Sequence, residues 1–260
     1  MASVPVESVT DLWTCWTEMM GSDMRAFGWT RRDFIAAGLA GAYAGLAPAA
    51  VAPVILVVGD SLSAEYGLKR GSGWVALLEQ RLAKEKIPAR VVNASISGDT
   101  TAGGRSRLPA LLQQQKPTHV VIELGANDAL RGLPLGMTEA NLAQMTQAAQ
   151  KAGARVLLLG MQVPPNYGTD YTNRFGALFG KVAKENKAAL VPFFLHRVAD
   201  VPDPLKMFQA DRIHPTEAAH PLILDNVWPE LKKMLAAAEP PQGGQAPRGG
   251  RAKPVGAPAS

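Results

Sequence analysis

A serine and a histidine, far apart in the sequence, have neighbours that suit them to nucleophilic chemistry. Ser61 follows an apolar run at residues 54–58, in the stretch VVGDSLSAEYG. His214 lies in DRIHPTEAA, three residues after Asp211. A serine hydroxyl is a weak nucleophile until a base, usually a histidine oriented by a carboxylate, takes its proton. Because Asp211 can reach the imidazole from its own segment, the three side chains could form a catalytic triad.

Simpler roles exist for each of these residues. Ser61 could cap the helix that follows it, and Asp211 could cap a turn beside a surface histidine. The other histidines have ordinary structural interpretations: His119 opens a strand, His196 follows one, and His220 begins the last helix at the surface. The triad therefore depends on what the fold places around Ser61.

The elements that must position these residues alternate between apolar runs and helical patterns. Gly, Pro or Asn bounds each of five apolar runs, which span residues 54–58, 89–94, 119–124, 154–161 and 188–194. The stretches between them carry apolar residues at helical spacing. Strands that are apolar throughout and separated by helices predict an α/β protein, with a mainly parallel five-stranded sheet in a three-layer α/β/α domain.

The loops after the first three strands are rich in Gly, Ser, Asp and Asn, and read GDSLSAEYG, SISGDTTAGG and GANDALRG. Ligands of parallel sheets bind beyond the carboxyl ends of the strands, where such loops meet. A phosphate-binding loop at GDTTAGGR is excluded, because the required Lys-Ser/Thr pair is replaced by Arg105-Ser106. The pattern favours a serine-based active site at this edge of the sheet.

Four segments resemble, in order, the sequence blocks of the GDSL, or SGNH, hydrolase family: GDSLS, SISGDTT, GANDA and DRIHP. The resemblance extends over roughly residues 54–235. Within the family, GDSLSAEYG and VPPNYGTDYTNRF are most similar to bacterial periplasmic thioesterases and lysophospholipases, also called arylesterases. The resemblance implies the flavodoxin-like SGNH fold and a serine hydrolase of acyl esters and thioesters that needs no metal or organic cofactor.

Transferred residue by residue, the resemblance makes Ser61 the nucleophile, His214 the base and then the acid, and Asp211 its orienting partner. The backbone N–H groups of Ser61 and Gly98 and the side-chain amide of Asn127 would form the oxyanion hole. Glycine allows close backbone approach to a bound oxygen, and an asparagine amide is a neutral donor suited to transition-state charge.

Five further residues are expected to bind substrate: Asp60, Glu65, Pro164, Asn166 and Tyr167. The last three belong to residues 163–175, which follow the fourth strand and which we expect to form a mobile loop at the acyl pocket. Glu65 departs from the thioesterase group, which often has glycine there, and so bears on substrate preference.

Residues 30–53, TRRDFIAAGLAGAYAGLAPAAVAP, have the order of an export signal: paired arginines, a short apolar segment and small residues. TRRDFI resembles the twin-arginine motif, which predicts a periplasmic or secreted enzyme without a stable membrane anchor. A buried alanine-rich helix is the alternative. Met24 is the expected start, because residues 1–23 hold acids but no Lys or Arg. We divide the chain into an extension with its signal (1–52), a hydrolase domain (53–236) and a disordered Pro/Gly-rich tail (237–260).

Charge and cysteine usage limit the partners. The net charge of +5 is scattered singly, so we expect no nucleic-acid partner. The single cysteine, Cys15, excludes an intramolecular disulfide. We expect a monomer or weak dimer whose partner is a small acyl ester or thioester. Two alternatives remain: a carbohydrate or cell-wall O-acetylesterase, and a non-catalytic binding protein on the same fold.

Overall fold

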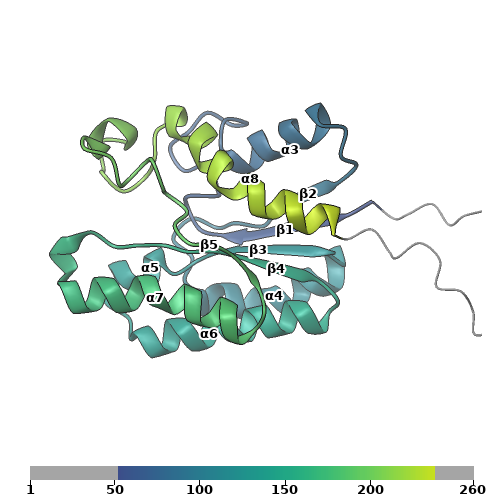
Figure 1. Ribbon diagram of the computed structural model, residues 1–260, viewed down its shortest axis with the longest axis horizontal. Coiled ribbons are helices and arrows are strands. Elements are labelled where there is room, and N and C mark those ends of the chain that lie inside the picture. The colour runs from purple at the N-terminus through teal and green to yellow at the C-terminus, as the bar shows by residue number, and fades with distance from the viewer. Residues whose placement is uncertain (1–51, 238–260) are drawn as a thin grey trace, which may run out of the picture. The chain divides into compact units, whose positions relative to one another are not determined.

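Residues 52–237 are the part of the chain that the computed structural model describes, and they form a five-stranded sheet between two layers of helices (Figure 1). The strands pair in parallel in the order β2-β1-β3-β4-β5. Their bounds are β1 Val54–Gly59, β2 Arg90–Asn93, β3 His119–Glu123, β4 Arg155–Leu159 and β5 Ala189–Val191. The predicted fold class is confirmed, and each strand lies in one of the five apolar runs.

The helices cover both faces of the sheet. Helices α3 (Trp74–Lys84) and α8 (His220–Ala236) pack on one face, and α4 (Thr101–Gln115), α6 (Leu135–Lys151) and α7 (Thr169–Glu185) on the other (Figure 1). A short helix, α5 (Ala126–Leu130), follows β3, and short 3₁₀ turns lie at η1 Pro165–Tyr167, η2 Pro204–Met207 and η3 Glu217–Ala219. Helix α7 is typical, because its buried side chains recur at helical spacing and face the sheet: Phe175, Leu178, Phe179, Val182 and Ala183.

The two central strands supply the rigid base of the site. Residues Ile55, Leu56, Val57 and Val58 of β1 have no solvent exposure, and β3 is buried along its whole length. Burying each such side chain stabilises the fold by roughly 1.5–3 kcal/mol. The chain leaves β1 toward β2 and later returns to β3 on the other side, so the loops after β1 and β3 diverge and leave a crevice at their carboxyl ends.

Two expectations from the sequence are wrong. Residues 163–175 are not one loop, because α7 already begins at Thr169 and only the turn around η1 precedes it. His220 is not at the surface: it is buried, and its Nδ1 accepts a hydrogen bond from the backbone N–H of Trp74 at 3.0 Å, which caps α3. Burial lowers the pKa of His220 to about 4.

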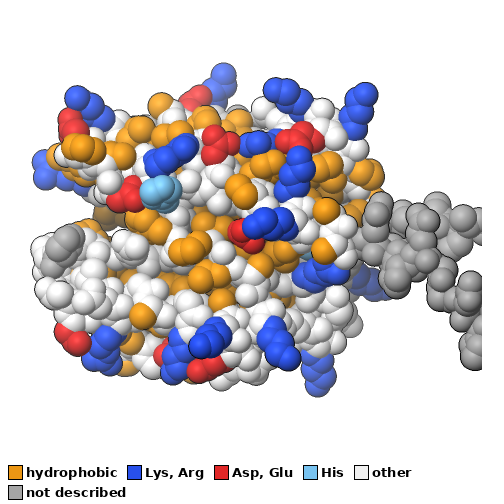
Figure 2. Space-filling model, viewed as in Figure 1, with side chains coloured by type: hydrophobic (Ala, Val, Ile, Leu, Met, Phe, Trp, Pro, Cys, Tyr) orange, Lys and Arg blue, Asp and Glu red, His pale blue; other side chains and the backbone are white. Residues whose placement is uncertain are grey.

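The predicted export signal and the carboxyl-terminal tail lie almost entirely outside the described residues. Within residues 52–237, no helix has the length and apolar character needed to cross a membrane. Charged side chains of both signs are scattered over the face shown in Figure 2.

Candidate active site

Three predicted residues meet at the carboxyl end of β1. Ser61 Oγ lies 2.8 Å from His214 Nε2, and His214 Nδ1 lies 2.6 Å from Asp211 Oδ2. Ser61 comes from the turn after β1, whereas Asp211 and His214 come from the long segment between β5 and α8. The fold thus brings two side chains that are 153 residues apart in the sequence within hydrogen-bond distance.

The turn that carries Asp211 fixes its charge. Asp211 Oδ1 accepts the backbone N–H groups of Ile213 at 2.9 Å and His214 at 3.0 Å, and the left-handed φ of 59° at Arg212 makes this turn possible. The Ile213 N–H, together with the His214 ring, lowers the pKa of Asp211 to about 2. An ionised Asp211 accepts the Nδ1 proton of His214, so Nε2 is left to accept the proton of the Ser61 hydroxyl.

Ser61 does not cap a helix. Residues 61–67 form consecutive turns, and α3 starts only at Trp74, with Gly73 as its N-cap. The helix-cap alternative is therefore wrong. The half-buried Ser61 hydroxyl is directed at His214.

The three expected oxyanion donors follow β1, β2 and β3: Ser61 and Gly98 lie in turns, and Asn127 lies in α5. Among residues 52–237, no protein acceptor receives the backbone N–H of Ser61 or of Gly98. Gly98 has a left-handed φ of 78°, which glycine adopts without strain, and the Arg131 guanidinium donates to its carbonyl at 2.7 Å. Both hydrogens of the Asn127 amide are engaged, with Asp60 Oδ2 and with Asp99 O at 2.9 Å each, so an oxyanion would share or replace one of these bonds.

A buried cluster anchors the Gly98 loop to the Asn127 loop. Asp128 Oδ2 accepts the backbone N–H of Thr101 at 2.9 Å, and Asp128 Oδ1 accepts the hydroxyls of Thr101 and Thr138. The side-chain amide of Asn141 on α6 donates to the Thr101 hydroxyl at 3.0 Å. These bonds hold the first turn of α4 against α5 and α6, and so fix the distance between Gly98 and Asn127.

Asp60 differs from the prediction that it binds substrate, whereas the contact of Glu65 with substrate stays a prediction. Asp60 is 1% exposed, and its carboxylate accepts the backbone N–H of Leu62 at 3.0 Å as well as the Asn127 amide. The Glu65 carboxylate accepts the backbone N–H groups of Gly71 at 3.0 Å and Gly73 at 2.9 Å, which closes the loop before α3. The Asp60 carboxylate therefore braces the backbone next to Ser61, whereas the Glu65 carboxylate braces the loop before α3.

The other three predicted substrate-binding residues are exposed at η1, after β4. Tyr167 begins a row of aromatic rings that runs into the core, with ring centroids 6.2 Å apart from Tyr167 to Tyr171 and 6.3 Å from Tyr171 to Phe175. Among residues 52–237, no hydrogen bond joins Pro164 or Asn166 to Ser61. Their contact with substrate therefore stays a prediction.

Two residues that sequence analysis missed join the histidine segment to the serine turn. The Tyr66 ring lies over the His214 ring, with centroids 4.2 Å apart. The Gln209 side-chain amide donates to Tyr66 O and to Pro215 O, both at 3.0 Å. Tyr66 could have been noticed in the sequence, because it is an aromatic residue only five positions after Ser61. No local sequence pattern distinguishes Gln209.

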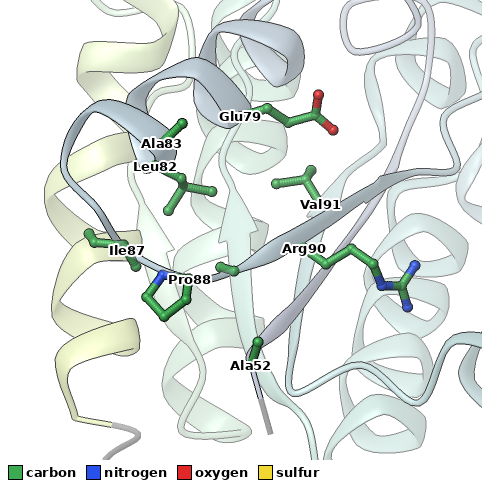
Figure 3. Close-up of a pocket in the computed structure, with 9 residues that line it drawn as sticks. Ala52, Glu79, Leu82, Ala83, Ile87, Pro88, Arg90 and Val91 are labelled. Carbon is green, nitrogen blue, oxygen red and sulfur yellow. The ribbon is translucent and has the colours of Figure 1, made fainter. Parts of the chain in front are cut away.

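A cavity of about 560 Å³ lies at the other end of the sheet, between α3 and β2 (Figure 3). Ala52 and Pro88, at the amino ends of β1 and β2, belong to its lining, and the side chain of Arg90 points away from it (Figure 3). The rest of the lining is mostly aliphatic. This cavity is separate from the site at Ser61, which follows the carboxyl end of β1.

The model of the GDSL-like Lipase/Acylhydrolase family matches residues 57–222, which include Ser61, Gly98, Asn127, Asp211 and His214. The chain belongs to this family. Over 186 residues this GDSL hydrolase is 58% identical to Esterase TesA of Pseudomonas aeruginosa, covering 72% of this chain and 91% of that protein. It is 43% identical over 187 residues to Thioesterase 1/protease 1/lysophospholipase L1 of Escherichia coli, covering 72% and 87%.

A crystal structure of TesA has the same fold as this GDSL hydrolase. It aligns with a TM-score of 0.67 at 57% identity, covering 70% of this chain and 99% of that chain. The family resemblance found in the sequence is thus confirmed, and the protein is a hydrolase of ester bonds.

Proposed function

We propose that this GDSL hydrolase cleaves acyl esters and thioesters, including aryl esters, acyl-CoA and lysophospholipids, through an acyl-Ser61 intermediate. The observation that carries the proposal is the hydrogen-bonded line from Asp211 through His214 to Ser61. His214 takes the hydroxyl proton as Ser61 Oγ attacks the acyl carbon, then gives it to the leaving oxygen or sulfur. A water deprotonated by His214 next attacks the acyl carbon. The bond from that carbon to Ser61 Oγ breaks, His214 returns the proton to Oγ, and the carboxylic acid leaves.

In both steps, negative charge develops on the carbonyl oxygen of the acyl group. The backbone N–H groups of Ser61 and Gly98, together with the Asn127 amide, are donors suited to that oxygen. The hydrogen bonds of the surrounding loops hold these donors before substrate arrives, and the Asn127 amide shares or gives up one of its two bonds as the charge appears.

Apolar surface next to the site supports an acyl substrate. Two exposed apolar side chains lie beside the triad: the Tyr66 ring centroid is 4.2 Å from that of His214, and Ile213 directly precedes His214 in the sequence. The names of the relatives, an esterase and a thioesterase/lysophospholipase, point to the same chemistry.

A substrate panel on the purified protein tests the proposal. Nitrophenyl esters of increasing acyl length, an acyl-CoA and a lysophosphatidylcholine are each assayed against the wild type and Ser61→Ala. We expect turnover of longer acyl esters and of the thioester by the wild type alone. Strict preference for acetyl esters would favour the O-acetylesterase, and failure to turn over any substrate would favour the binding protein.

We also propose that the enzyme is exported, on the strength of residues 30–53 of the sequence. Sequencing the amino terminus of protein recovered from the periplasm or medium tests this. We expect a start at Ala50 or Pro53, and a mature protein that keeps the paired arginines would contradict the proposal.

A further inference from the structure

Beneath Ser61, buried polar groups form a directed chain of hydrogen bonds. The indole Nε1–H of Trp74 donates to Ser63 Oγ at 3.0 Å, and the Ser63 hydroxyl donates to Glu123 Oε2 at 2.8 Å. The backbone N–H of Asp60 also donates to Glu123 Oε2, at 3.3 Å. The side chains of Asp60, Ser63 and Glu123 are each about 1% exposed, so water does not satisfy them.

The register of the sheet explains how Glu123 reaches this position. Gly59 at the end of β1 pairs with Glu123 at the end of β3. A Cβ at position 59 would lie 2.8 Å from both Glu123 Oε2 and Ser63 Oγ. The glycine that precedes Asp60 and Ser61 therefore makes room for a carboxyl group directly under the turn.

Two buried carboxyl groups lie close together here. The backbone N–H of Asp60 donates to Glu123 Oε2 at 3.3 Å and both side chains are about 1% exposed, so two negative charges in this place would repel each other. The two oxygens of Asp60 already accept from Leu62 N–H and from the Asn127 amide. Two donors favour an ionised Asp60, which leaves the proton on Glu123. Burial, and then the charge of Asp60, raise the pKa of Glu123 well above its usual value.

We propose that Glu123 acts as a neutral carboxylic acid that positions the Ser61 turn and the Asn127 amide. It accepts from the Ser63 hydroxyl and the Asp60 N–H, and its proton keeps a second negative charge away from Asp60. Glu123 acts through Asp60, because one carboxylate oxygen of Asp60 accepts the backbone N–H of Leu62 and the other accepts the side-chain amide of Asn127. Glu123 touches no reacting atom, so it is a positioning residue, and this role rests on the function proposed for Ser61.

Few charges surround the pair. His214 attracts Asp60 electrostatically, and the Arg107 guanidinium, paired with Asp99 at 2.8 Å, donates to Gly59 O at 3.4 Å. No cation contacts Glu123 itself within the hydrogen bonds of the described residues. Ionising Glu123 would therefore place two carboxylates in contact, and their repulsion would displace Asp60 from Asn127.

Two substitutions separate the neutral acid from a charged one. Glu123→Gln has the same shape and no charge, and keeps a carbonyl acceptor for the Ser63 hydroxyl and for the Asp60 N–H, so we expect kcat within about threefold of the wild type. Glu123→Leu removes this acceptor, and we expect kcat to fall on the order of 100-fold with a smaller change in KM. Thr146→Val is the control, because it removes another buried hydrogen bond, to Leu142 O on α6, away from the site.

The outcomes decide the proposal in either direction. Equal loss in Glu123→Gln and Glu123→Leu would show that a charged carboxylate is required, and full activity in Glu123→Leu would remove the positioning role. If Glu123→Leu does not fold, infrared spectroscopy of the wild type at pH 7 still decides. We expect the C=O band of a buried protonated carboxyl that disappears in Glu123→Gln, and a wild type without this band overturns the proposal. The band does not depend on turnover, so its absence is distinguishable from failure of the hydrolase function.

Discussion

Neighbouring hydrogen-bonding groups decide the state of the residues around Ser61. The Ile213 N–H is the main cause of the lowered pKa of Asp211, and the Asn127 amide is held by the Asp60 carboxylate and by Asp99 O. The sequence predicted Asp211 and His214 together because both lie in one turn. It misassigned Asp60, because one of the two groups that hold its carboxylate, the Asn127 amide, is 67 residues away in the sequence.

Asn127→Ala tests the oxyanion hole. We expect kcat to fall on the order of 100- to 1000-fold, because one of three donors to the developing oxyanion is lost, while KM changes little. Steady-state kinetics on a nitrophenyl ester measure both. Asn186→Ala is the matched control, since its amide bonds Val182 O at the end of α7. Unchanged kcat in Asn127→Ala would exclude the donor role.

At the scale of elements, the site depends on how two segments are tied together. The segment between β5 and α8 carries His214, and Gln209 links it to the turn after β1. The five strands could be predicted because buried parallel strands are apolar throughout. The start of α7 could not, because Thr169, Asp170 and Asn173 make its first turns look like a loop. Glu123 carried a usable signal, as the only charged residue inside the apolar run of β3.

Gln209→Ala tests this link. Without the two hydrogen bonds of its amide, His214 is held less firmly against Ser61, and we expect about a tenfold or larger decrease in kcat. The rate at which a fluorophosphonate labels Ser61 should decrease in parallel. Gln147→Ala, which removes an exposed amide bonded to Asn186, should label at the wild-type rate. If the fluorophosphonate labelled Gln209→Ala at the wild-type rate, Gln209 would not be needed to position the segment that carries His214.

For the molecule as a whole, the buried acid pair makes stability depend on pH. Burial raises the pKa of both Asp60 and Glu123, so the folded state holds their protons more tightly than the unfolded chain does. Their contribution to stability is fully present below the ordinary carboxyl pKa of about 4. It is lost as the pH rises through the raised values of the folded state.

Thermal unfolding across a pH series measures this effect. We expect the Tm of Glu123→Gln to rise relative to that of the wild type as the pH increases from about 5 to about 9, because glutamine has no proton to lose. Thr146→Val should follow the wild-type pH dependence at a lower Tm. Parallel curves for Glu123→Gln and the wild type would show that Glu123 does not titrate in this range.

Trapping the acyl-enzyme tests the central claim, that Ser61 is the nucleophile. The protein is mixed with a nitrophenyl ester, quenched in acid during turnover, digested and mapped by mass spectrometry. We predict the acyl mass on the peptide that contains Ser61, and its absence from a folded Ser61→Ala variant that has lost turnover. An acyl group on another residue, or continued turnover by Ser61→Ala, would contradict the account.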